Sequence, residues 1–255
     1  MVEIKTDTSV NAMREAGRVV AEALTAVREA ARVGVRLREL DEVARAVLRE
    51  AGASSPFLGY RPSWAPTPFP AVVCTSVNDA IVHGVPTDYR LGDGDLVSVD
   101  CGATLDGWVG DAAVTFSVGT PRPDDVHLAD TARAALDAGI AAAVPGNRIG
   151  DIAHAIGRVC RSAGYGIPQG FGGHGVGRSM HEGPDVPNEG RAGRGLVLRH
   201  GMVLAIEPML IGGGRDAFYA DADGWTLRTC DGSRAAHAEH TVAITDAGPR
   251  LLTVV

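Results

Sequence analysis

Hydrophobic residues in the first fifth of the chain recur at helical spacing. Along the first stretch, apolar side chains return one or two turns apart, at Val10, Met13, Val20, Leu24 and Val27. Charged residues lie between them, so the pattern predicts an amphipathic helix. A second helix is predicted over Leu37–Ala51, with Gly52 placed to end it.

The following segment, residues 53–70, contains five prolines and several aromatic residues. Proline lacks a backbone N–H and fixes its own φ angle, so no regular element is expected here. We interpret the segment as a constrained loop. Its aromatic side chains then form either a lid over an apolar surface or the wall of a pocket.

Valine-rich stretches beyond this loop predict strands over residues 71–77 and 96–118. Two more helices are predicted at roughly Asp125–Val144 and Ile149–Ala163, with Gly164 as the stop. Strands return over residues 202–210, 224–229 and 237–245. Helices therefore precede strands twice, which predicts an α+β fold. We expect one domain over residues 1–255, built from two similar halves at roughly 1–120 and 121–255.

Length and composition are those of an ordinary globular protein, with 255 residues, 45% of them hydrophobic and 22% charged. The net charge of -7 gives no electrostatic reason to expect nucleic acid or a membrane as partner. The polar N-terminus does not resemble a secretory signal, and no apolar run approaches membrane-spanning length. Widely spaced cysteines without a Cys-x-x-Cys pair argue against disulfides and structural zinc, and suit a cytoplasmic location.

Two aspartates are predicted to share one face of a β-hairpin in the 96–118 segment. If Asp106-Gly107 is a two-residue turn, the numbers of paired residues sum to 213, and Asp100 lies opposite Ala113. Asp111 then projects from the same face, about 7–8 Å away along the diagonal. Two carboxylates so placed repel each other unless a cation lies between them. The alternative is that each aspartate is a solvated strand residue or forms a turn, which we expect only for Asp93, Asp95 and Asp106, each beside a glycine or in a turn pair.

Two glutamates interrupt apolar strand segments in the same way. Glu207 follows four apolar residues and precedes a proline, and Glu239 lies within the strand-like 237–245. Each could be a buried acid paired with arginine. A third feature is the glycine-rich run 171–184, FGGHGVGRSMHEGP, which holds His174 and His181. Two aspartates, two glutamates and one histidine form a mostly oxygen ligand set, suited to one or two divalent ions.

Six segments, taken in order, carry a resemblance to a known family. VHGVP, SVDCG, GDAAVTF, GGHGVGRSMHEGP, AIEP and AEHT resemble the signature blocks of type I methionine aminopeptidases over almost the whole chain. The resemblance implies a pita-bread fold, in which two pseudo-symmetric α+β halves surround a curved antiparallel sheet. It also implies removal of the N-terminal methionine from peptides and nascent proteins when the second residue is small.

The resemblance assigns roles to matching residues. Asp100 would chelate one metal ion, His174 and Glu207 the second, and Asp111 and Glu239 would bridge the two. A hydroxide shared by the ions would attack the first peptide bond, with Glu207 as the proton shuttle. The ligand set tolerates cobalt, manganese, iron and zinc.

Residues around the metal site are also implied by the resemblance. His181 would bond the scissile carbonyl, and His83 would reach the amide nitrogen of the leaving peptide. An apolar methionine pocket would be lined by Tyr60, Phe69, Cys74, Met180 and Trp225, each of which could instead be ordinary core. His237 and His240 flank Glu239 and are expected just outside the ligands, whereas His127, His154 and His200 are expected on the surface.

The sequence departs from the family at residues 61–70. Members usually have a short glycine-containing turn after the Gly-Tyr, whereas this chain has the longer, proline-rich RPSWAPTPFP. The departure leaves open how Trp64 and Phe69 contribute to the pocket wall. We expect no zinc-finger extension, so a transient ribosome contact would use the catalytic domain itself.

Two alternatives remain from the sequence. The X-prolyl peptidases share the five-ligand plan but usually carry a large additional N-terminal domain. A non-catalytic relative that binds peptide or RNA would be expected to have lost ligands, and all five are present here. The family also implies a monomer.

Overall fold

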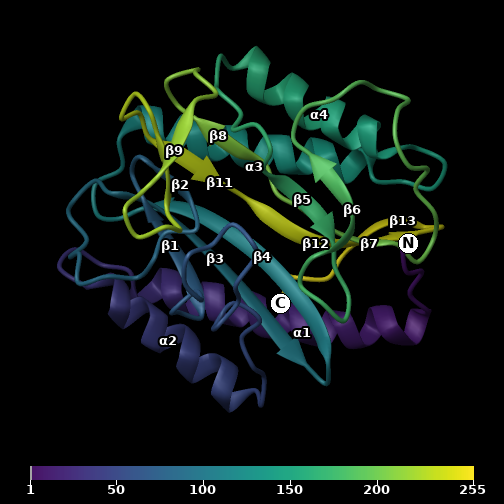
Figure 1. Cartoon of the computed structure of the whole chain (residues 1–255), viewed down its shortest axis with the longest axis horizontal. Coiled ribbons are helices and arrows are strands. Elements are labelled where there is room, and N and C mark those ends of the chain that lie inside the picture. Colours follow the sequence, from purple (N-terminus) through teal and green to yellow (C-terminus); the bar gives the residue numbers. More distant parts are fainter. Residues whose placement is uncertain (1) are drawn as a thin grey trace.

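The part of the chain that the structure describes contains four helices, at the positions that the hydrophobic spacing predicts. The computed structural model describes residues 2–255. The helices are α1 (Asp7–Ala30), α2 (Leu37–Glu50), α3 (Pro123–Ala142) and α4 (Ile149–Ser162). Their observed ends lie within two or three residues of the predicted ones. In Figure 1, α1 and α2 lie side by side, and α3 and α4 form the second pair.

Local signals mark the start of α1 and the predicted end of α2. The Thr6 hydroxyl accepts a hydrogen bond from the Ser9 N–H and so caps the first turn of α1. Gly52 follows α2 with a φ of +68°, and the next N–H, of Ala53, bonds back to the carbonyl of Leu48 at 2.8 Å. A left-handed glycine satisfies the last carbonyls of a helix in this way.

Every strand pair in the described chain is antiparallel. The strands are β1 (Val73–Val77), β2 (Ala80–Val82), β3 (Leu96–Leu105), β4 (Trp108–Ser117), β5 (Gly172–Gly175), β6 (Glu182–Pro187), β7 (Val203–Ile206), β8 (Met209–Ile211), β9 (Phe218–Ala220), β10 (Leu227–Thr229), β11 (Ala235–His237), β12 (Glu239–Thr245) and β13 (Gly248–Leu251). The main sheet has eight strands in the order β1-β3-β4-β12-β7-β5-β6, with β13 paired to β12. Five strands, β2, β5, β6, β9 and β13, lie where the sequence predicted none.

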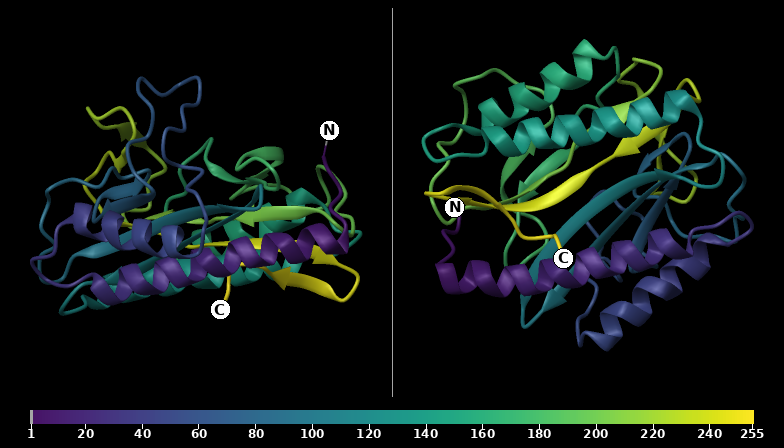
Figure 2. Two further views of the ribbon diagram at one scale, coloured as in Figure 1. Left: turned by 90° about the horizontal axis from the view of Figure 1, so that it is seen from below. Right: turned by 180° about the vertical axis from the view of Figure 1, so that it is seen from behind.

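The helices cover one face of the main sheet, and long loops stand on the other (Figure 2). Each helix pair packs its own hydrophobic core against the sheet, one beneath α1 and α2 and one beneath α3 and α4. The predicted α+β class, with helices preceding strands twice, is confirmed. Within residues 2–255, no helix is both long and apolar enough to span a membrane.

Candidate metal centre and active site

The register of the sheet places two of the predicted ligands in one row. Val99 and Cys101 pack into the core beneath α1 and α2, so Asp100 between them points to the opposite face. Asp100 pairs with Ala113 of β4, as the hairpin arithmetic predicts, and Ala113 pairs with Glu239 of β12. Asp100 and Glu239 therefore lie on either side of Ala113, on the face of the sheet that carries the long loops.

The remaining three ligands share that face. Asp111 lies two residues before Ala113 on β4, so its side chain projects to the same side. On the other half of the sheet, His174 of β5 pairs with Ala205 of β7. Glu207 follows Ala205 by two residues and keeps the same orientation. Four acids and one imidazole, from five strand segments, therefore converge on one side of the sheet.

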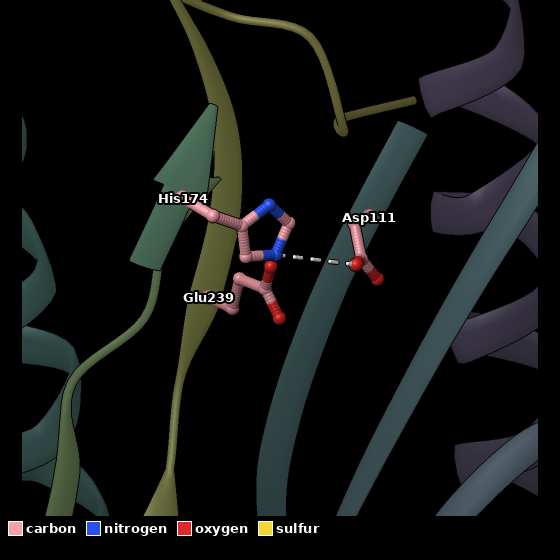
Figure 3. A group of neighbouring side chains, drawn as sticks. All are labelled: Asp111, His174 and Glu239. Carbon is pink, nitrogen blue, oxygen red and sulfur yellow. Dashed lines mark ion pairs between the residues drawn. The ribbon is translucent and has the colours of Figure 1, made fainter. Parts of the chain in front are cut away.

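His174 has its ring oriented by the backbone. Its Nδ1 lies 2.8 Å from the carbonyl oxygen of Gly175. A carbonyl only accepts, so Nδ1 carries the hydrogen and Nε2 keeps a free lone pair. That Nε2 lies 3.5 Å from Glu207 Oε1 and 4.0 Å from Asp111 Oδ2. In Figure 3, one nitrogen of the ring faces the carboxylates of both Asp111 and Glu239. The free lone pair thus points into the acidic cluster.

Burial makes the charged form of every carboxylate in the cluster unfavourable. Burial raises the pKa of Asp100 to about 7 and the pKa of Glu207 to about 8. For Asp111 and Glu239, burial and then the neighbouring carboxylates raise the pKa well above its usual range. Burial also lowers the pKa of His174 to about 4, so its imidazole is neutral at pH 7. The cluster therefore has no permanent positive charge of its own.

Unsatisfied atoms in the cluster fit a divalent cation. Asp100 Oδ1, Asp111 Oδ1, Glu239 Oε1 and His237 Nε2 are buried and have no hydrogen-bond partner. Such groups are costly unless something else binds them. Among residues 2–255, none of the four carboxylates forms a salt bridge with lysine or arginine; the imidazoles of His174 and His237 are the nearby bases. The arginine-paired alternative is thus wrong, and oxygen and imidazole donors of this kind suit a hard or borderline metal ion.

His237 was expected just outside the ligands, and its imidazole lies beside two of them. Its Nε2 lies 3.6 Å from Glu207 Oε2 and 3.8 Å from Glu239 Oε2. These three side chains form a second group in which the donor atoms all lie within 4.8 Å of one another, beside the group of Asp111, His174 and Glu239. By contrast, the ring of the neighbouring His240 turns away and bonds Thr253. The sequence itself indicated this position, because residues 237 and 239 lie two apart on an extended chain and their side chains share a face.

Glycines beside His174 allow the strands to approach closely. A Cβ on Gly173 would lie 2.1 Å from the carbonyl oxygen of Ala205, and one on Gly175 would lie 2.2 Å from that of Gly183. No side chain fits at such distances. The glycine-rich run therefore makes room for neighbouring backbone, and this close packing fixes His174 in the sheet.

The five predicted ligands line a cavity of about 370 Å³ together with every predicted pocket residue. These are Tyr60, Phe69, Cys74, Met180 and Trp225, along with His83 and His181. Phe69, Cys74, Met180 and Trp225 are also buried members of one hydrophobic cluster. The choice between pocket wall and core packing was therefore not exclusive, because these side chains do both. Sequence reasoning missed Phe57, Phe171, Asp185 and Met209, which also line the cavity.

His83 and His181 reach the cavity from opposite halves of the chain. The His83 backbone has a φ of +59°, a conformation that is unfavourable for a residue other than glycine. Burial lowers its pKa to about 4, and its Nδ1 has no hydrogen-bond partner. The His181 ring stacks on Tyr60 with centroids 5.3 Å apart, and lies 4.2 Å from the His174 ring. Both imidazoles therefore have donor atoms available at the cavity.

Outside the cavity, the expectations for single residues mostly agree with the structure. His127, His154 and His200 are exposed. Asp95 was expected to be solvated or to form a turn, and only the second holds. It is buried and accepts hydrogen bonds from Asn78, Tyr89 and the Gly92 N–H, so local bonding compensates its desolvation.

Comparisons with known proteins agree with this geometry. The sequence matches Metallopeptidase family M24 over residues 11–246, and the chain belongs to that family. A relative from Mycobacterium tuberculosis named methionine aminopeptidase 1 is 53% identical over 252 residues, which cover 96% of this chain and 92% of that protein. The crystal structure of a methionine aminopeptidase from Thermotoga maritima has a TM-score of 0.95 at 39% identity and covers all of both chains.

A second branch of the family shares the fold less closely. The prolidase from Pyrococcus furiosus has a TM-score of 0.78 at 25% identity, and the alignment covers 99% of this chain but 65% of that one. The pita-bread fold implied by the resemblance is confirmed by these structures.

Proposed function

We propose that this chain is a methionine aminopeptidase, a metal-dependent hydrolase. It removes the N-terminal methionine from peptides and nascent proteins whose second residue is small. One observation carries the proposal: five ligands, four of them buried and Asp100 half-buried, converge in a cavity with apolar and sulfur-containing walls. The chain also resembles proteins of that name along nearly their whole length.

The ligand set supports two ions. Asp100 would hold one, His174 and Glu207 would hold the other, and Asp111 and Glu239 would contribute to both. When bound, such ions supply Lewis acidity and lower the pKa of a shared water. Cobalt, manganese, iron and zinc all suit these donors. The unpartnered oxygens of Asp100, Asp111 and Glu239 support this assignment.

The protein's own groups orient the substrate and move protons. Glu207 accepts a proton from the attacking water at its carboxylate and returns it to the leaving amine. His181 donates a hydrogen bond to the scissile carbonyl as negative charge develops there. His83 bonds the amide nitrogen of the leaving peptide. Its lowered pKa keeps the imidazole neutral at pH 7, so one ring nitrogen can accept a hydrogen bond from that amide N–H.

Apolar walls select methionine. Tyr60, Phe69, Cys74, Met180 and Trp225 provide a flexible, polarisable surface for a thioether. Residues 1–255 act as one catalytic domain with halves at about 1–120 and 121–255, and the loop 53–70 supplies one wall of the pocket.

The cellular setting follows from the same proposal. The enzyme is cytoplasmic and monomeric, meets nascent N-termini, and contacts the ribosome transiently through its catalytic domain. Three buried free cysteines, Cys74, Cys101 and Cys160, suit a reducing compartment.

Peptide hydrolysis tests the proposal. With added cobalt or manganese, the protein should release methionine from Met-Gly and Met-Ala peptides, spare Met-Lys peptides, and lose turnover with a chelator. Asp111→Asn should bind metal poorly and be inactive, whereas Asp106→Asn, a matched change at the exposed turn of the same hairpin, should behave as wild type. Cleavage of X-Pro peptides but not Met-Gly would move the assignment to the X-prolyl branch. Normal activity of Asp111→Asn would contradict its role between the ions.

A further inference from the structure

The proline-rich loop at the cavity mouth is held in one shape by its own hydrogen bonds. At its base, the Gly59 N–H donates to the carbonyl of Phe69, and the Phe69 N–H donates to that of Tyr60, both at 2.8 Å. Within the loop, the Arg61 guanidinium crosses over and donates to the carbonyl of Pro66 at 3.0 Å. Prolines further restrict the backbone. The loop is thus ordered before any ligand arrives.

The C-terminal half of the chain holds the tip of this loop. The Trp225 indole N–H donates to the carbonyl of Thr67 at 3.0 Å. Gly224 packs against Pro66 so closely that a Cβ there would lie 2.3 Å from the proline ring. Figure 2 shows the loop of residues 61–70 standing out on the side away from the helices. Residues 61–70 therefore form a fixed wall.

Trp64 presents a large apolar ring at the mouth of the cavity. Its indole stacks on the His83 ring, with centroids 5.8 Å apart and planes inclined by 21°. It also meets Trp225 edge-on at 5.1 Å. Even so, 52% of Trp64 remains exposed. Phe171 lies edge-on to His83 at 5.9 Å and lines the same cavity. An exposed indole, held in place by ordered aromatic neighbours, is a surface suited to binding an apolar group.

Trp64 lies close enough to His83 to contact the part of a substrate peptide that follows the cleaved bond. This step rests on the proposed function, in which His83 bonds the amide nitrogen of the leaving peptide. An extended peptide advances about 3.3 Å per residue, so the third residue comes within reach of a ring 5.8 Å beyond His83. Side chains 1 and 3 project to the same side of an extended chain. The first enters the pocket walled by Trp225, and Trp64 contacts Trp225.

We propose that Trp64 forms a subsite for the third residue of the substrate peptide, and that the enzyme favours N-termini with an aromatic residue there. The second residue stays small, and the third side chain stacks on the exposed indole face. An aromatic pair is worth about 0.5–1.5 kcal/mol beyond its burial, which corresponds to a preference of about three- to tenfold.

Two matched peptides test the subsite. The kcat/KM of wild-type protein should be about three- to tenfold higher for Met-Ala-Phe-Gly than for Met-Ala-Ser-Gly, mainly through KM. Trp64→Ala should bring this ratio close to one, and Trp64→Phe should keep most of it. Tyr219→Ala, which removes another exposed aromatic that does not line the cavity, should leave the ratio unchanged. By calorimetry, the product Ala-Phe-Gly should bind wild type more tightly than Ala-Ser-Gly does, and Trp64→Ala should bind both equally.

The outcomes separate this inference from the function on which it rests. Cleavage of neither peptide by wild type, with metal added, would overturn the proposed function. Equal cleavage of both by wild type would overturn the subsite alone. So would a preference that persists in Trp64→Ala, or an equal loss of activity on both peptides in that variant.

Discussion

Without metal in the cluster, the free energy of unfolding of the protein should fall as the pH rises above neutral. Without cations, the buried carboxylates hold their protons more tightly in the folded chain than in the unfolded one. Burial and mutual repulsion raise the pKa of Asp111 and Glu239 well above the usual range, and burial raises that of Glu207 to about 8. A raised carboxyl pKa stabilises the folded state at low pH, and this contribution is lost as the pH rises through the folded-state value.

The window from about pH 7 to pH 8 isolates this effect. The buried imidazoles of His83 and His174 have their pKa lowered to about 4, so above pH 7 they are neutral in the folded chain. Unfolded histidines, with a pKa of about 6.5, are mostly neutral there too. Each carboxyl group that keeps its proton across one pH unit costs about 1.4 kcal/mol of stability. With one or two such groups, the free energy of unfolding should fall by about 1.4–3 kcal/mol.

Urea unfolding of chelator-treated protein, followed by tryptophan fluorescence at fixed ionic strength, measures this slope. Asp111→Asn removes one carboxyl group and should flatten it, whereas Asp106→Asn should retain it. Saturating metal should abolish the decline, because the ions bind the deprotonated ligands. A metal-free protein whose stability stays constant or rises from about pH 7 to pH 8 would refute the reasoning.

Three further predictions concern single residues. Lys5 is 4% exposed, and its ammonium group pairs with the Glu182 carboxylate at 2.6 Å. Lys5→Met should therefore lower the free energy of unfolding, measured in urea, by about 1–3 kcal/mol. Unchanged stability would show that the ion pair makes no net contribution to folding. Gly17→Ala should destabilise the protein by about 1–3 kcal/mol, because the new Cβ would lie 2.2 Å from the Leu252 carbonyl oxygen. Helix propensity alone predicts that alanine would stabilise α1. A raised melting temperature would therefore contradict the predicted clash. His83→Ala should lower kcat about 100-fold or more while metal content stays unchanged, and loss of bound metal in that variant would assign His83 a different role.

The hairpin of β3 and β4 was predictable residue by residue. Asp106 and Gly107 adopt φ angles of +50° and +75°, as a tight two-residue turn requires, and the pairs Leu105–Trp108 and Asp100–Ala113 follow. A turn of fixed length sets the register of a hairpin without further information. For that reason local sequence was enough to place Asp100 and Asp111 on one face.

Other parts of the site depend on contacts that local sequence does not encode. Strand β5 consists of Gly172, Gly173, His174 and Gly175, a composition with little strand propensity, and pairing with β6 and β7 imposes its conformation. The burial of Asp95 depends on partners up to 17 residues away. The rigid wall formed by the proline-rich loop requires Trp225, which is 158 residues distant from the carbonyl that it binds.

Metal titration of chelator-treated protein, with methionine release from a Met-Gly peptide measured at each step, tests the central claim most directly. We predict no release without metal, and release that rises with added ion and levels off once two ions are bound per chain. The same titration of Asp111→Asn should show weak binding and no release. Methionine release that survives chelation, or a wild-type protein that binds no divalent ion, would contradict the assignment of these five side chains to a catalytic metal centre.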